Sequence, residues 1–137
     1  NESVAQCMYQ TADGLYGRTH STDHLVRHEN LQEYPPLVSA LRHDFSSRGS
    51  VLRVVVDAGA NDGFSTWRFA RALPNATVLA IEPGKENYAM TLLNTRSLPN
   101  VHAVHAALWN NGSRTLQLAG QRMGEWAISA HEPGKRS

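Results

Sequence analysis

Three short apolar runs at nearly equal spacing constrain the fold of this chain more than any other feature of its sequence. The runs cover 51–56, 77–81 and 101–106, and their first residues lie 26 and 24 residues apart. The two intervals hold helix-like stretches over 64–73 and 85–95, each followed by a Pro-Asn pair that would end a helix. Strands that alternate with helices in this way form right-handed crossovers and a parallel sheet. The sequence therefore predicts an α/β fold with a parallel sheet and flanking helices.

The apolar residues of these elements also predict how the elements pack. The run over 51–56 is apolar on both faces, which is typical of a strand covered by helices on either side. In the first helix Phe64, Trp67 and Ala70 share one side. In the second helix the residues expected to face inward are Tyr88, Ala89, Leu92 and Leu93.

The first fifty residues are polar and irregular, and we assign 1–50 to an N-terminal polar, partly helical extension. The stretch 11–30 reads as a loop with a short helix near 25–31. A second helix is expected to begin at Pro35 and Pro36, because a proline in the first turn of a helix loses no hydrogen bond. Gly49 and the serines around it are expected to end that helix.

The region 51–137 reads as the N-terminal half of a larger α/β domain. Beyond Leu108 the alternation fades, leaving short strands at 115–118 and 127–130 and a polar tail. A complete doubly wound sheet needs on the order of 180 residues, whereas 87 residues follow from Val51 onward. The sheet therefore looks truncated. Its unpaired strand edge predicts that the chain alone is unstable or self-associates.

Composition excludes several classes of protein. Thirteen Lys and Arg residues stand against twelve Asp and Glu, so the formal charge of +1 provides no long-range field for nucleic acid or an anionic membrane. No apolar run approaches the roughly 20 residues of a spanning helix. The single cysteine, Cys7, excludes an internal disulfide scaffold and a cysteine-rich metal cluster. The chain begins at Asn1, so a targeting signal cannot be judged and the compartment stays open, cytoplasmic by default.

A group of histidines in the extension invites a metal interpretation. His24 and His28 would share one face of a helix, with His20 and Asp23 close in sequence. No cysteine or glutamate completes a ligand set, so we expect a solvated stretch there and no metal.

The chemistry is concentrated where the first predicted strand meets the first helix. The sequence there reads Asp57-Ala58-Gly59-Ala60-Asn61-Asp62-Gly63. Gly59 lets the backbone turn sharply and approach a ligand, and Gly63 is expected to do the same at the helix entrance. Asp62 or Ser65 can cap that helix, whose free N–H groups favour a carboxylate or phosphate. Glu82 ends the second strand and is placed to accept hydrogen bonds from both hydroxyls of a ribose.

Two common nucleotide motifs do not fit this loop. The dinucleotide fingerprint, begun at Gly59, would need glycines where Asn61 and Phe64 stand. A P-loop would need a lysine before Ser65. The spacing suits a ligand without a pyrophosphate, such as a nucleoside joined to a small zwitterion.

Three ordered motifs resemble a known family. They are Val55-Val56-Asp57-Ala58-Gly59-Ala60-Asn61-Asp62-Gly63-Phe64-Ser65-Thr66, then Ala80-Ile81-Glu82-Pro83 with Glu86-Asn87, then Val101-His102-Ala103-Val104-His105-Ala106-Ala107-Leu108. Over about 51–118 the chain is similar to the FkbM family of S-adenosylmethionine-dependent methyltransferases. The resemblance implies a Rossmann-like class I methyltransferase fold.

The resemblance also implies a cofactor site. The loop would lie under the methionine part of S-adenosylmethionine, with Asp57 near its amino group and the N–H groups and hydroxyls around Ser65 and Thr66 near its carboxylate. Glu82 would hold the ribose. The cofactor-binding residues expected on this basis are Asp57, Gly59, Ala60, Asn61, Gly63, Phe64, Ser65, Thr66, Glu82, Pro83, Ala107 and Leu108, the last two bordering the adenine. Trp109 is a candidate for stacking on adenine, although such aromatics more often belong to a core, and His105 lies near the pocket edge.

The function implied is methyl transfer to a hydroxyl of a sugar, glycan or other small molecule. The family's later strand with an Asp-x-Glu-Gly motif has no counterpart here, so the acceptor site, general base and oligomeric state are left open. Two alternatives to the methyltransferase function also stay open. One is a non-catalytic fragment or remnant of the same fold. The other is a nicotinamide-dependent oxidoreductase, which Asn61 and Phe64 disfavour.

Overall fold

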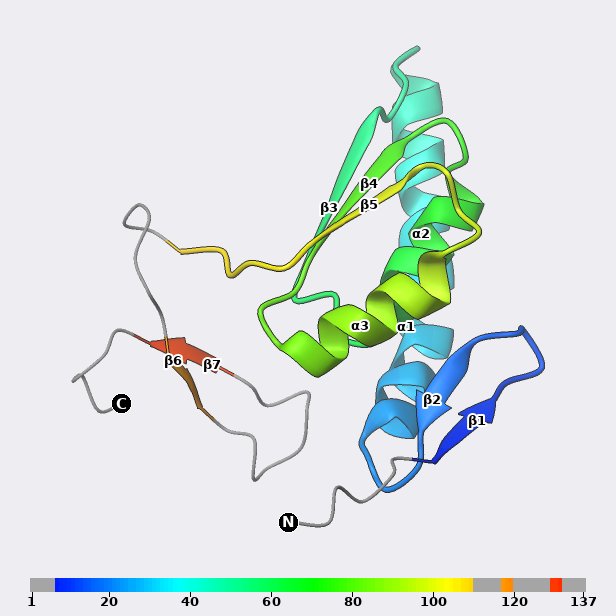
Figure 1. Cartoon of the computed structure of the whole chain (residues 1–137). Coiled ribbons are helices and arrows are strands. Elements are labelled where there is room, and N and C mark those ends of the chain that lie inside the picture. The colour runs from blue at the N-terminus through cyan, green and yellow to red at the C-terminus, as the bar shows by residue number, and fades with distance from the viewer. Residues whose placement is uncertain (1–6, 110–116, 120–128, 132–137) are drawn as a thin grey trace, which may run out of the picture.

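The computed structural model describes residues 7–109, 117–119 and 129–131. Figure 1 shows the arrangement of the elements. In chain order they are β1 (Met8–Gln10), β2 (Tyr16–Arg18), α1 (Asp23–Ser47), β3 (Val54–Ala58), α2 (Phe64–Ala72), β4 (Thr77–Ile81), α3 (Lys85–Thr95), β5 (Val101–Val104), β6 (Gln117–Ala119) and β7 (Ser129–His131).

The centre of the fold is a three-stranded parallel sheet in the order β3-β4-β5. Val55 pairs with Val78, and Val78 pairs in turn with Val101. Helix α2 connects the first two strands and α3 the second two. The expected α/β class and strand alternation are confirmed, as a partial Rossmann-like unit. The strand bounds differ from the expected ones: β3 begins three residues later than predicted and runs into the loop motif, and β5 ends at Val104.

The helices lie on one side of this sheet, to its right and below it in Figure 1. On that side Val78 and Ala80 are almost fully buried. On the other side the side chains of Val54, Val56 and Val104 keep 57%, 54% and 42% of their surface exposed. The expectation of helices on both faces of the first strand is therefore wrong for the described part of the chain. Two successive right-handed crossovers in one direction place both helices on the same face.

Helix α2 packs as expected and α3 does not. Phe64 and Ala70 of α2 are buried, with Trp67 half-buried. In α3, however, Leu92 is 45% exposed and Ala89 is also exposed. The inner face of α3 is instead largely polar: Asn87, Met90, Thr91, Asn94 and Thr95. The predicted inward set is therefore wrong for Ala89 and Leu92, whereas Tyr88 and Leu93 are half-buried. The cause is that α3 packs on a hydrogen-bonded loop and hairpin that need polar partners.

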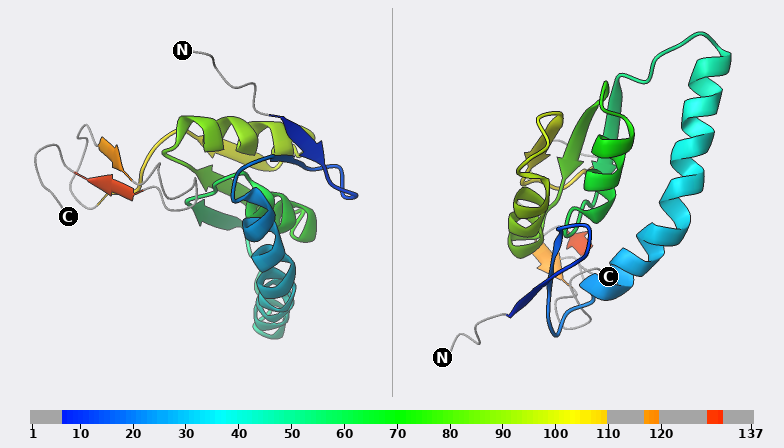
Figure 2. Two further views of the ribbon diagram at one scale, coloured as in Figure 1. Left: turned by 90° about the horizontal axis from the view of Figure 1, so that it is seen from below. Right: turned by 90° about the vertical axis from the view of Figure 1, so that its right-hand side faces the viewer.

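The N-terminal segment is more ordered than its composition suggested. A single helix, α1, replaces the expected loop and two helices, and Pro35 and Pro36 lie inside it. The right-hand view of Figure 2 shows this helix curving along its length beside the sheet. Both prolines are exposed, so water can satisfy the carbonyl groups whose helical hydrogen bonds they remove. Val38 and Tyr34 of α1 belong to the cluster built around Phe69 and Val78, which offsets the cost of the prolines.

Two antiparallel hairpins complete the described structure. Strands β1 and β2 pair around a turn in which Thr11 donates its N–H to the carbonyl of Leu15. This hairpin falls in a stretch expected to be irregular. Strands β6 and β7 also pair and overlap the two short strands predicted beyond Leu108, whose remaining residues lie outside the described part. Over the described residues, no helix is long and apolar enough to cross a membrane.

Candidate functional site

The loop between β3 and α2 has an alternating backbone. Gly59, Asn61 and Gly63 have φ values of +79°, +53° and +83°, in the left-handed region that glycine and asparagine tolerate best. The loop leaves the carboxyl end of a parallel strand, where open α/β sheets bind their ligands. The sequence therefore places its glycines where the backbone requires them.

Glycine is needed at positions 59 and 63 for different structural reasons. Apart from its chain neighbours, no described residue has an atom within 4 Å of the position that a Cβ on Gly59 would take, so the backbone there is open to an approaching molecule. A Cβ on Gly63 would lie 2.8 Å from the Cα of Thr91. Gly63 thus allows α3 to pack against the loop, whereas a ligand contact had been expected for it.

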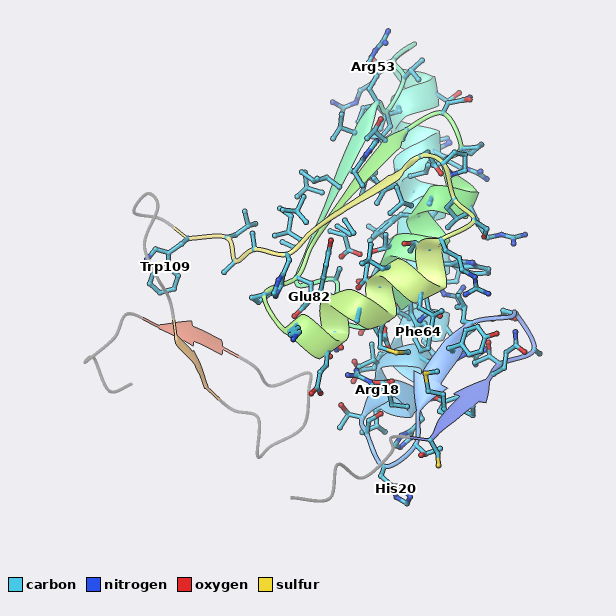
Figure 3. All side chains as sticks on the ribbon, in the orientation of Figure 1. Arg18, His20, Arg53, Phe64, Glu82 and Trp109 are labelled. Atoms are coloured by element: carbon cyan, nitrogen blue, oxygen red, sulfur yellow. The ribbon has the colours of Figure 1, made fainter. Side chains whose placement is uncertain are left out.

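Glu82 joins the loop to the end of β4. Its Oε2 accepts the backbone N–H of Asn61 at 2.9 Å, and its Oε1 accepts the N–H of Gly84 at 2.7 Å. The residue is buried, and Figure 3 shows its label beside the start of α3. A carboxylate offers about four acceptor positions, so the two bonds leave capacity for further donors.

Asp57 is buried on the helix side of β3. Its Oδ2 accepts the hydroxyls of Ser65 at 2.8 Å and Thr66 at 2.5 Å. These hydroxyls, expected beside a cofactor carboxylate, are thus directed at Asp57. The backbone N–H groups of the same two residues belong to the first turn of α2, where no helical partner exists.

The cap of α2 differs from the one expected. The N-cap residue is Gly63, which has no side chain to cap with. Asp62 still contributes, because its Oδ1 accepts the N–H of Phe64 at 3.2 Å. Ser65 lies inside the helix and does not cap it.

Helix α3 holds the loop from the other side. The hydroxyl of Thr91 donates to the carbonyl of Asn61 at 2.7 Å, and Nδ2 of Asn94 donates to the carbonyl of Asp62 at 2.8 Å. Asn94 also exchanges two hydrogen bonds with the backbone of Tyr16 in β2, at 2.7 and 3.0 Å. One asparagine therefore ties the N-terminal hairpin to the loop.

A buried ion pair lies next to this junction and was missed by the sequence reasoning. Arg18 and Asp23, both almost fully buried, are joined by Nη2 to Oδ1 at 2.7 Å and by Nε to Oδ2 at 3.0 Å. Nη2 of Arg18 also reaches Oδ1 of Asn87 in α3 at 2.9 Å. Only the Arg-x₄-Asp spacing could have suggested the pair, and such spacings are common.

Asp62 is fully buried beside the same cluster. Burial, with the nearby Asp23 carboxylate adding to it, raises the pKa of Asp62 from its ordinary value of 3.8 to about 8. The side chain is therefore neutral at pH 7.

The remaining expected residues fall into two groups. Ala60 and Phe64 are buried under the loop, and Pro83 is half-buried after β4. Leu108 and Trp109 are exposed beyond β5, as is part of Ala107. Figure 3 shows Trp109 well to the left of Glu82, so the two do not converge in this structure.

His105, expected near the pocket edge, contacts the turn that follows β4. Its Nε2 is 3.0 Å from the carbonyl oxygen of Pro83, and its ring stacks on that of Tyr88 with centroids 5.0 Å apart. These two rings border the turn that follows Glu82.

The side chains of the histidine-rich stretch do not come together as a group. Asp23 is engaged by Arg18, whereas His20, His24 and His28 are exposed. Across the described residues, no group of three or more His, Cys, Asp or Glu side chains has an arrangement that could hold a metal ion.

No protein-family model matches the chain, and no curated protein matches it either. The fold and the loop therefore define the class of this protein only as an α/β protein with a partial Rossmann-like sheet.

Proposed function

We propose that this chain is the S-adenosylmethionine-binding part of a class I methyltransferase of the FkbM type. One observation carries the proposal: the buried carboxylate of Glu82 lies against the open loop at Gly59, held there by the hydrogen bond from the backbone N–H of Asn61. The assignment to the family depends on the order of the three sequence motifs.

The geometry around Glu82 supports a ribose site. The carboxylate lies at the end of the strand next to β3, is fixed by two backbone N–H groups, and retains acceptor positions for the two hydroxyls of a ribose. The carboxylate also repels a 2′-phosphate, which favours an unphosphorylated nucleoside.

The start of α2 supports the zwitterionic end of the same ligand. Backbone N–H groups at a helix N-terminus favour a carboxylate. Asp57, held by Ser65 and Thr66, provides a negative charge below the loop for an ammonium group. Among the described residues no hydrogen bond reaches its Oδ1. The aromatic pair of Tyr88 and His105 borders the turn after Glu82 and offers a flat surface for a base.

The reaction would be an in-line displacement. S-adenosylmethionine, when bound, supplies a methyl group on a positively charged sulfur. The methyl group would pass to an oxygen of a sugar or small-molecule hydroxyl as that hydroxyl is deprotonated, and S-adenosylhomocysteine would be the leaving group. The residues described here would orient the methyl donor and exclude water.

The test is a thermodynamic cycle measured by titration calorimetry. S-adenosylhomocysteine and its 2′-deoxy analogue are each titrated into the wild type and into Glu82→Gln. Loss of the ribose 2′-hydroxyl should weaken binding to the wild type by roughly tenfold. It should weaken binding to Glu82→Gln much less, because that variant already lacks the carboxylate that accepts from the hydroxyl.

Glu86→Gln is the matched control, because Glu86 is an exposed carboxylate four residues further on. It should bind both ligands as the wild type does. Absence of any heat with S-adenosylhomocysteine, or an equal loss on deoxygenation in wild type and Glu82→Gln, contradicts the proposal. Tight binding of NAD would favour the oxidoreductase instead.

A further inference from the structure

A cationic groove lies between α1 and α2, and no residue of the loop after β3 lines it. Its volume is about 520 Å³, within the range of small-molecule sites. Its lining includes Tyr34, Val38 and Arg42 from α1, and Trp67, Arg68 and Arg71 from α2. Val38 and the two aromatic rings give the groove apolar walls, and the three arginines give it charge.

The positive charge of this groove is not balanced from within. No Asp or Glu is among the described residues that line it. The guanidinium of Arg42 donates to the carbonyl of Ala72, and that of Arg71 lies over the ring of Trp67 at 4.8 Å from its centroid. Arg68 makes no hydrogen bond or ion pair with any described residue.

Helix electrostatics explain only part of this arrangement. Arg71 is in the last turn of α2, where a cation interacts favourably with the helix dipole, and Arg42 satisfies a carbonyl at the same end. Arg68 lies one turn earlier and gains nothing from the helix end. Three like charges around one cavity repel each other unless an anion joins them.

We propose that the groove between α1 and α2 binds a small anion carried on a ring, such as a phosphate or sulfate monoester of an aromatic or sugar ring. The arginine N–H groups would hold the anionic oxygens through charge-assisted hydrogen bonds. The ring would lie between Tyr34 and Trp67, with Val38 beneath. None of the proposed cofactor-binding residues lines the groove, and this proposal does not depend on the cofactor site.

The test uses phenyl phosphate, inorganic phosphate and phenol as probes, titrated by calorimetry into the whole chain in a low-salt buffer free of phosphate and sulfate. Phenyl phosphate should bind more tightly than inorganic phosphate, and phenol should not bind measurably. Phenyl sulfate in a parallel titration distinguishes a phosphate site from a sulfate site. Binding should weaken as salt is raised.

Arg68→Gln should weaken binding of phenyl phosphate by roughly tenfold or more, and Arg68→Lys should retain part of it. Arg53→Gln is the control, because Arg53 is exposed and does not line the groove. Because Arg68 makes no hydrogen bond or ion pair with any described residue, Arg68→Gln should leave the fold intact. The melting curve of each variant verifies this. Failure of phenyl phosphate to bind at millimolar concentration, or equal affinity in Arg53→Gln and Arg68→Gln, overturns the proposal.

Discussion

Asn61 donates its backbone N–H to Oε2 of Glu82 across 2.9 Å, joining two residues that lie 21 positions apart. The bond links the loop after β3 to the end of β4, and it makes Glu82 a structural residue before any ligand arrives. A carboxylate fixed in this way is already oriented, so less rotamer entropy is lost when it accepts hydrogen bonds from a ligand.

Glu82→Ala should therefore lower the free energy of unfolding as well as any ligand affinity. The variant leaves the N–H groups of Asn61 and Gly84 without their acceptor, at a cost of about 1–3 kcal/mol. Urea unfolding measures the change. Glu86→Ala, at an exposed site, should stay within about 0.5 kcal/mol of the wild type. Equal stabilities of the two variants would contradict the role of Glu82 in the loop.

Gly63→Ala should be strongly destabilising. The new methyl group would require a left-handed backbone and would lie 2.8 Å from the Cα of Thr91, for a combined cost of about 2–5 kcal/mol. Gly49→Ala is the matched control, since Gly49 also has a positive φ (+61°) but, among the described residues beyond its chain neighbours, no atom within 4 Å of the added position. It should cost roughly 1–2 kcal/mol. Thermal melts that rank the two variants in the opposite order would show that α3 does not pack as described.

Breaking the buried ion pair should destabilise the chain far more than breaking an exposed one. Asp23→Asn removes the carboxylate that pairs with the buried Arg18 guanidinium, which costs about 3–5 kcal/mol. Asp44→Asn breaks the exposed pair with Arg48 and should cost less than about 1 kcal/mol. Denaturant unfolding of both variants provides the comparison. A small effect of Asp23→Asn would mean that the hairpin is not anchored through Arg18.

Asp62 should make stability fall as the pH rises. The folded side chain keeps its proton up to about pH 8, whereas the ordinary pKa is 3.8. The folded state therefore binds more protons than the unfolded state between about pH 4 and pH 8, and the free energy of unfolding decreases over that window. Asp62→Asn removes this dependence, so its stability relative to the wild type should increase from pH 5 to pH 8. Parallel pH profiles of the two proteins would argue against the raised pKa.

The uncovered face of the sheet should drive self-association. Val54 and Val56 are more than half exposed, and β3 is an edge strand of the described sheet, a combination that favours pairing with another molecule. Val56→Lys should weaken association by roughly tenfold in sedimentation velocity runs at several concentrations. Val51→Lys is the control, because Val51 is as exposed but precedes the strand. A wild type that stays monomeric at every concentration would refute this prediction.

The sequence by itself determined the parallel sheet and the position of its loop. The runs that became β3, β4 and β5 are strongly apolar and evenly spaced, and the glycines at 59 and 63 stand where the backbone takes positive φ values. These are local signals, because strand preference and backbone freedom are properties of neighbouring residues.

Only the tertiary structure decided what surrounds that loop. The pairing of Arg18 with Asp23, the anchoring of Tyr16 by Asn94 and the polar inner face of α3 depend on contacts between distant segments. The same is true of α1, where packing of Tyr34 and Val38 overrides two prolines that locally predict a helix start. Buried polar groups must find hydrogen-bond partners, and here those partners come from distant segments of the chain. The periodicity of a single segment therefore cannot predict them.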